Sequence, residues 1–160
     1  MRVRDVMDRK AARVSPDDPL RVAAELLALT GASDLAVVGE DGTFMGVLSE
    51  GDLLRALMPD FDDIDPGQAT LERAYAFFVN AGESRVDDPV INHVIHNPFT
   101  VGPDDQLLQP AALMVSKQIR RLPVVASGRF LGTVSRADIC WALLCDVADD
   151  TGASVPAATG

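Results

Sequence analysis

The chain contains one pattern of residues twice, and this repetition constrains its fold more than any other feature. A glycine, two small or apolar residues, a serine and, three residues later, an aspartate occur at residues 46–52 and again at 132–138. Each copy follows an apolar, strand-like run and precedes a helical pattern. The similarity extends outward, because the Pro16-Asp17-Asp18 turn returns as Pro103-Asp104-Asp105 at nearly the same offset. The sequence therefore predicts two copies of one structural unit.

Together these elements resemble the CBS (cystathionine beta-synthase) domain, a family whose members occur in tandem pairs. Val3–Met7 is similar to the opening of that family's helix-strand-helix-strand-strand-helix unit, and residues 122–125 are similar to its central strand. The two glycine–serine–aspartate copies are similar to its nucleotide-binding motif. The resemblance covers roughly residues 2–57 and 90–147. It implies an α/β (α+β) fold of two pseudo-symmetric repeats, each a small sheet packed against two helices.

The expected organisation has a first repeat at residues 1–57, an acidic linker at 58–89, a second repeat at 90–147 and a flexible tail at 148–160. We expect the repeats to form one compact module, since 160 residues suit a single domain with a sizeable core. Within the linker, residues 68–79 have apolar side chains at helical spacing. They predict an extra amphipathic helix, which either covers part of the module or contacts a partner.

Local patterns predict, in chain order, a helical turn at residues 4–7, a helix after Asp17 or Asp18, strands at 35–38 and 44–48, and further helices at 50–57, 68–79, 105–117 and 136–147. Asp17 or Asp18 is expected to cap the first long helix, because a carboxylate there accepts hydrogen bonds from free backbone N–H groups. Pro110 lies inside the expected 105–117 helix. Proline past the first turn removes a helical hydrogen bond, so we expect this helix to begin late or to be distorted.

Composition excludes several classes of function. A net charge of −10 argues against nucleic acid as a partner, because its phosphates would be repelled. No run of eighteen apolar residues is present, so no segment is expected to cross a membrane. The charged N-terminus lacks the apolar region of a signal peptide. Cys140 and Cys145 are expected to be unpaired thiols on one helix, which is typical of a reducing, cytoplasmic location.

Neither catalysis nor a metal site is expected. The sequence contains no nucleophile elbow, no Walker phosphate loop, and no serine or cysteine with an identifiable base. His93 and His96 lie three residues apart, but two histidines without a third ligand are weak evidence for a metal. The aspartate-rich stretch from Asp60 does not fit a calcium loop, because Ile64 and Asp65 occupy its fifth and sixth positions.

The repeated serine and aspartate have two interpretations. In the structural interpretation, Ser49 and Ser135 are helix N-caps, and Asp52 and Asp138 are ordinary first-turn acids. In the binding interpretation, which the repetition favours, the same groups surround an anionic ligand at a helix N-terminus. The resemblance implies that each aspartate accepts hydrogen bonds from the two hydroxyls of a ribose. It also implies that each serine lies near the ribose or the phosphate.

Other candidate residues follow from the same resemblance. They are, for the purine, Thr100 and the backbone around Leu35 and Leu122 and, for charge-assisted hydrogen bonds to phosphate, Arg120, Arg121 and Arg136. Solvated surface charge is the alternative interpretation of each arginine. The first repeat has Ser33-Asp34 and Glu50 at the corresponding positions. We therefore expect the site around Asp138 to bind a phosphorylated nucleotide more tightly than the site around Asp52.

The sequence thus predicts a non-catalytic, regulatory module that senses AMP, ADP or ATP in the cleft between its repeats. The nucleotide would be a regulatory ligand and not a catalytic cofactor. The resemblance further implies a homodimer, which would act in trans on an unknown protein partner. One alternative is an interaction scaffold with vestigial sites, whose linker helix binds a partner protein. Another is a sensor of S-adenosylmethionine or a related adenosyl ligand, whose positive sulfonium would suit an acidic pocket.

Overall fold

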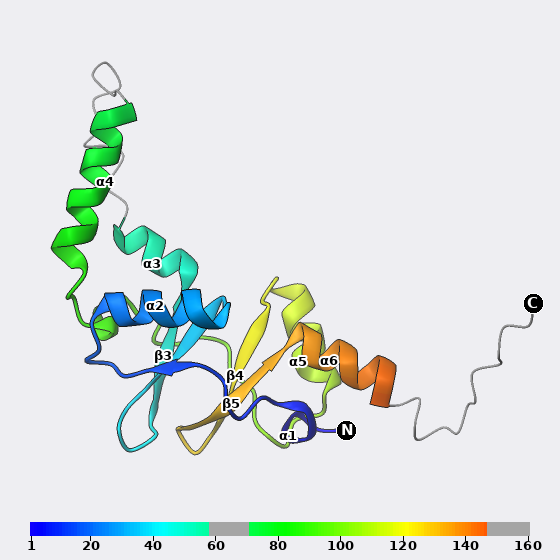
Figure 1. The fold of residues 1–160 in the computed structure, drawn as a ribbon. Coiled ribbons are helices and arrows are strands. Elements are labelled where there is room, and N and C mark those ends of the chain that lie inside the picture. Colours follow the sequence, from blue (N-terminus) through cyan, green and yellow to red (C-terminus); the bar gives the residue numbers. More distant parts are fainter. Residues whose placement is uncertain (58–70, 147–160) are drawn as a thin grey trace, which may run out of the picture. The chain divides into compact units, whose positions relative to one another are not determined.

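A computed structural model describes residues 1–57 and 71–146 of the chain (Figure 1). The first part of the expected linker and the expected tail, at 58–70 and 147–160, lie outside the described residues. Within the described part, no helix combines the length and the apolar character needed to cross a membrane. The combination of helices with small sheets confirms the α/β (α+β) fold class.

The chain folds into two compact units that interleave along the sequence. Unit 1 comprises residues 1–10, 99–127 and the chain from 131 onward, and unit 2 comprises residues 11–98 with 128–130. The opening segment of each sequence repeat therefore belongs to the unit built mainly from the other repeat. The spatial units thus divide the chain differently from the two sequence repeats.

Unit 2 contains a three-stranded sheet with the order β1-β2-β3. Its elements are β1 (Arg13–Val14), α2 (Leu20–Thr30), β2 (Asp34–Val38), β3 (Phe44–Ser49), α3 (Glu50–Leu57), α4 (Leu71–Arg85) and the 3-10 helix η2 (Val90–His93). β1 is parallel to β2, and β2 is antiparallel to β3. The core is aliphatic and includes Val14, Leu20, Ala23, Leu27, Leu35, Val37, Leu48 and Val90.

Unit 1 repeats this plan around a two-stranded sheet. Its elements are α1 (Val3–Val6), α5 (Leu108–Ser116), β4 (Arg121–Ala126), β5 (Arg129–Ser135, of which the first two residues are grouped with unit 2), α6 (Arg136–Trp141) and the π-helical turn η3 (Ala142–Asp146). A parallel bridge between Val101 and Val124 takes the place that β1 has beside β2. The core includes Val3, Met7, Val101, Leu107, Met114, Leu122, Val124, Val134 and Ile139.

The exchanged opening segments explain the glycine of the repeated motif. In unit 1, the backbones of Asp8 and Thr133 exchange two hydrogen bonds of 2.8 and 3.0 Å. A Cβ atom at Gly132 would lie 2.3 Å from the carbonyl oxygen of Asp8, and φ is +152° there. Gly46 in unit 2 faces the carbonyl of Ile95 in the same way, at 2.4 Å. Both glycines are therefore required by close backbone packing.

The predicted strands and the helix after the first motif are confirmed with small changes. β2 and β3 begin and end within one residue of the predicted 35–38 and 44–48, and α3 has the predicted range. The predicted linker helix is present as α4, which spans Leu71–Arg85 and so continues beyond the predicted end at residue 79; residues 68–70 of the prediction lie outside the described residues.

The predicted aspartate cap of α2 was wrong. The helix begins at Leu20, with Pro19 at the N-cap and no side-chain hydrogen bond to the cap. Asp18 instead uses its carboxylate to accept the backbone N–H of Ser15 at 2.9 Å. Asp105 does the same with the N–H of Gly102 at 2.8 Å. In both repeats this carboxylate closes the turn before the helix, so it does not cap the helix itself.

The second repeat has the late helix start that Pro110 predicted. α5 begins at Leu108, so Pro110 is its third residue, and its side chain is fully buried. No helical hydrogen bond is lost there, because the first N–H groups of a helix have no partner within it. The final helix differs from the prediction of one regular helix at 136–147, because α6 passes into the π-helical turn η3 after Trp141.

Candidate functional site

The repeated motif forms a capping box at the junction of β5 and α6 in unit 1. Ser135 ends the strand and is the N-cap of the helix, where its Oγ accepts the backbone N–H of Asp138 at 3.2 Å. The Oδ2 atom of Asp138 accepts both the backbone N–H and the hydroxyl of Ser135, each at 2.7 Å. The structural interpretation of this serine and aspartate is therefore confirmed.

Unit 2 has the same arrangement at the junction of β3 and α3. Asp52 accepts the backbone N–H of Ser49 at 3.0 Å and also its hydroxyl, and its own N–H donates to Ser49 Oγ at 3.2 Å. Capping leaves the binding interpretation open, because in both motifs these hydrogen bonds occupy only the Oδ2 atom of the carboxylate.

The second carboxylate oxygen distinguishes the two motifs. In unit 2, Asp52 Oδ1 forms an ion pair with the guanidinium of Arg55, one turn further along α3. The second repeat has Trp141 at the corresponding position, and this side chain is 70% exposed. Across residues 1–57 and 71–146, Asp138 Oδ1 makes no hydrogen bond or ion pair. Asp138 therefore has an acceptor available to a ligand, whereas Asp52 does not.

The contacts of Asp52 also shift its pKa. Partial burial of the carboxyl acts to raise the pKa, since it removes water from the charged form. The hydrogen bonds from Ser49 and the hydrogen bond and charge of Arg55 outweigh this effect. The pKa of Asp52 therefore lies below its ordinary value of 3.8, and the group is ionised at neutral pH.

The three predicted phosphate-binding arginines differ in how their side chains are used. Arg136 donates from Nε to the carbonyl of Ile119 at 2.8 Å and from Nη2 to that of Met114 at 2.9 Å. Its guanidinium thus stabilises the C-terminal end of α5. Arg120 is exposed and Arg121 is half-buried, and neither side chain forms an ion pair with any residue that the structure describes.

Backbone pairing brings most of the remaining predicted residues of the second repeat to the same end of unit 1. The N–H of Arg136 donates to the carbonyl of Arg120 at 3.0 Å, which places the first turn of α6 beside the start of β4. On the other side of β4, the N–H of Val101 donates to Pro123 at 3.0 Å, so the exposed Thr100 also lies close to this strand. The side chains of Leu122 and Leu35 are buried in their cores, so only their backbones could contact a ligand.

Comparison with known proteins identifies the family of this fold. The family model of the CBS domain matches residues 3–59 and 90–145. The chain belongs to the CBS-domain family. Both matches agree with the repeats that were predicted from the sequence.

Two relatives of this CBS-domain protein align with it along most of their length. An uncharacterised protein of Methanocaldococcus jannaschii is 28% identical over 159 residues, which is 90% of this chain and 92% of the relative. The solved structure of CBSX2, a protein of Arabidopsis thaliana, in complex with AMP is 25% identical, with a TM-score of 0.67 over 89% of this chain and 96% of that chain.

A second similar structure is more distant. It is the CBS domain pair of the protein MJ0100 in complex with 5′-methylthioadenosine and S-adenosyl-L-methionine. It is 17% identical, and its TM-score is 0.63 over 89% of this chain and 95% of that chain. At this identity the likeness establishes only the shared fold.

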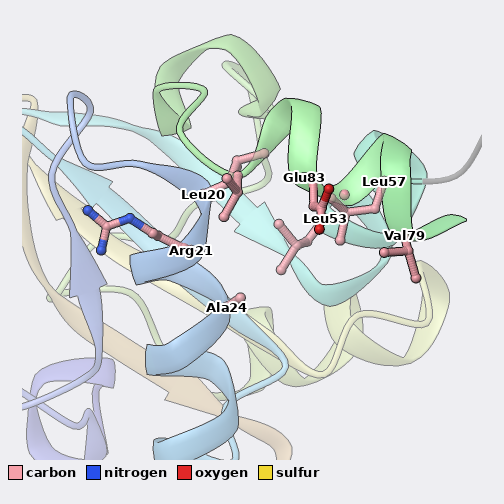
Figure 2. A pocket seen from close by; sticks show the side chains of 9 residues that line it. Leu20, Arg21, Ala24, Leu53, Leu57, Val79 and Glu83 are labelled. Atoms are coloured by element: carbon pink, nitrogen blue, oxygen red, sulfur yellow. The ribbon is translucent and has the colours of Figure 1, made fainter.

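A cavity of about 430 Å³ lies in unit 2, apart from the residues of the CBS motif (Figure 2). Its lining comes from α2, α3, α4 and the residue after α4, and comprises Leu20, Arg21, Ala24, Leu53, Leu57, Val79, Gly82, Glu83 and Val86. None of the predicted binding residues lines it. The cavity shows that the C-terminal half of α4, with Val79, Gly82 and Glu83, lies next to α2 and α3.

Other residues of potential chemical interest do not assemble into a site. His93 Nε2 lies 3.3 Å from Asp88 Oδ2 in unit 2, where it forms a pair and not a ligand set. Among the described residues, no three potential metal ligands of the histidine, cysteine or carboxylate type come together. Cys140 and Cys145 are both exposed and unpaired, in agreement with the prediction that they form no disulfide.

Proposed function

We propose that this CBS-domain protein is a non-catalytic, regulatory module that binds an adenine nucleotide at the motif of Ser135 and Asp138. The observation that carries the proposal is the state of the Asp138 carboxylate. Its Oδ2 atom is fixed by Ser135, so the group has a defined orientation, while Oδ1 makes no hydrogen bond or ion pair with a described residue. The AMP complex of CBSX2, which has the same fold, supports the choice of ligand.

The ribose is the part of the ligand that this carboxylate suits. A ribose has two adjacent hydroxyl donors, and an ionised carboxylate is a strong acceptor, so each hydrogen bond contributes about 1.5–3 kcal/mol. Asp138 Oδ1 accepts one hydroxyl directly. Oδ2 has further acceptor capacity beyond its two hydrogen bonds from Ser135. A nucleotide satisfies both oxygens, whereas a deoxyribose lacks one of the two donors.

The phosphate of the bound nucleotide would be held by Arg120 and Arg121. Both are free of ion pairs with described residues, and the backbone of Arg120 is hydrogen-bonded to the first residue of α6. Arg136 acts mainly through position, because its guanidinium already binds two carbonyl groups of the α5 terminus and the following loop. The proposal therefore assigns two cations to the phosphate where the sequence had indicated three.

The motif of Asp52 would be the weaker site, for a reason in addition to charge. A ribose must displace Arg55 from Asp52 Oδ1 before it gains that acceptor. The Arg55 side chain is 71% exposed, and an ion pair of this kind contributes at most about 1 kcal/mol. That contribution corresponds to about a fivefold loss of affinity. Unequal binding is thus expected even for ligands without a phosphate.

The regulatory output would be indirect. We propose that a homodimer of this chain in the cytoplasm transmits occupancy of the site to a separate protein partner. A scaffold whose sites are vestigial, and a sensor of S-adenosylmethionine or another adenosyl compound, are the alternatives. The adenosyl compounds share the ribose diol, so a common experiment separates the three.

The experiment is titration calorimetry of the full chain with AMP, ADP, ATP and S-adenosylmethionine. We expect AMP to bind the unaltered chain. The Asp138→Asn substitution is expected to lower the affinity for AMP by at least about tenfold, because one charged acceptor becomes a neutral amide. Asp5→Asn is the matched control, since the Asp5 carboxylate likewise accepts the backbone N–H of an N-cap residue, that of Arg2 at 2.7 Å, in α1 of the same unit. Unchanged binding in Asp138→Asn refutes the site. No binding of any adenosyl ligand to the unaltered chain favours the scaffold.

A further inference from the structure

An exposed aromatic side chain lies next to the predicted purine-binding segment of unit 1. Phe99 immediately precedes Thr100 and is 50% exposed. The Nζ atom of Lys117, just after α5, lies over its ring at 5.7 Å from the centroid. A cation on one face of an aromatic ring holds the ring by cation–π attraction. Half of the residue's surface nevertheless remains open to solvent.

This pair is a feature of the second repeat alone. At the corresponding positions the first repeat has Ala12 and Thr30, and the Thr30 hydroxyl donates to the carbonyl of Leu26 at 2.6 Å. Unit 2 builds the same strand and helix without an aromatic ring or a cation there. The fold therefore does not require Phe99 and Lys117, and their presence in unit 1 indicates a role other than packing.

Strand pairing puts Phe99 at the opposite end of the candidate site from Asp138. Val101 pairs in parallel with Val124, so two residues earlier Phe99 lies beside the start of β4. Ser135, at the end of β5, flanks the start of β4 on its other side. Neighbouring strands lie about 4.8 Å apart, which separates the backbones of Phe99 and Ser135 by about 10 Å. A nucleoside whose ribose is bound by Asp138 spans this distance with its base.

We infer that Phe99, held in place by Lys117, stacks on the base of the nucleotide bound at Asp138, and that this contact selects nucleotides over sugar phosphates. The inference rests on the proposed function and adds a residue that recognises the base. Stacking of a base on an aromatic side chain contributes about 1–3 kcal/mol. Since every base has a π-face, the contact favours the presence of a base more than the identity of the base.

The test compares two ligands that differ only in the base. AMP and ribose 5-phosphate are titrated into the Asp52→Asn variant of the chain, in which only the Asp138 motif is intact. This variant is the background for each further substitution. Adding Phe99→Ala is expected to lower the affinity for AMP about 5- to 150-fold. The affinity for ribose 5-phosphate is expected to change by less than about twofold. Phe99→Trp is expected to retain AMP binding. Val115→Ala is the control, because Val115 is an apolar residue of the same unit and is 75% exposed.

Two results would overturn the inference. The first is AMP binding that is unchanged by Phe99→Ala but lost in Asp138→Asn, because the nucleotide site would then exist without the stacking contact. The second is an equal loss of both ligands in Phe99→Ala, because Phe99 would then support the fold and not the base. Lys117→Met is expected to weaken AMP less than Phe99→Ala does. Absence of AMP binding in the unaltered chain refutes the proposed function as well, and so is distinguishable from either result.

Discussion

The ion pair between Arg55 and Asp52 permits a sharp test of how a CBS motif is blocked. Arg55 occupies the carboxylate oxygen that a ribose would need, while its counterpart in the second repeat is Trp141. Replacing Arg55 by leucine removes the competing cation and keeps an apolar stem of similar length on an exposed helix face. The change is expected to raise the affinity of the Asp52 motif for adenosine.

The expected size follows from exposure. The Asp52 side chain is only 10% exposed, but that of Arg55 is 71% exposed, so water competes for the guanidinium. Exposed pairs contribute about 0.2–1 kcal/mol, which corresponds to an increase of up to about fivefold in affinity. A larger gain would require a buried pair, which this one is not.

The assay uses adenosine, because it has the ribose diol but no phosphate. Removal of a cation would weaken a phosphate contact and would hide the effect with AMP. Calorimetry in the Asp138→Asn background isolates the Asp52 motif, and Arg55→Lys is the control that keeps the charge. The reasoning fails if Arg55→Leu lowers adenosine affinity, or if Arg55→Lys raises it as much as leucine does.

Three further predictions concern stability. Met7→Ala should destabilise the chain by about 2–5 kcal/mol in urea denaturation, because Met7 is buried in the core of unit 1; a loss under 1 kcal/mol would contradict that packing. Gly132→Ala should lower the melting temperature, since its Cβ would meet the Asp8 carbonyl at 2.3 Å, whereas Gly82→Ala, with nothing within 4 Å, should not. Asp52→Asn should lower the melting temperature at pH 6, and the difference should shrink as the pH falls below 3.8, because a depressed pKa stabilises the fold only while the carboxyl is ionised. A difference that does not shrink as the pH falls below 3.8 would assign it to another cause.

Local features of the structure were accessible from the sequence, because short-range chemistry decides them. The hairpin of β2 and β3 follows from two apolar runs around a turn that contains Asp-Gly, and the late start of α5 follows from Pro110. The serine and aspartate of each motif were assigned two roles, and the structure establishes the capping role.

Long-range choices were not accessible. Arg136 was interpreted as a phosphate ligand, and nothing in its immediate sequence indicates that Ile119 and Met114 present carbonyls to it. Asp18 resembles a helix cap until the turn that it closes is seen. The exchange of opening segments depends on backbone pairing between residues as distant as Asp8 and Thr133, for which a pattern within one repeat has no signal.

That exchange has a consequence for the order in which the chain can fold during its synthesis. Val3 and Met7 leave the ribosome roughly 100 residues before Val101 and Met114, with which they share a core. At about 5–20 residues per second, they wait about 5–20 s for those neighbours. Unit 2 is almost continuous in sequence, so it can close while unit 1 still lacks its second half. Val3 and Met7 are thus among the earliest residues to be made and among the last to be buried, and over that interval their apolar side chains remain accessible to chaperones.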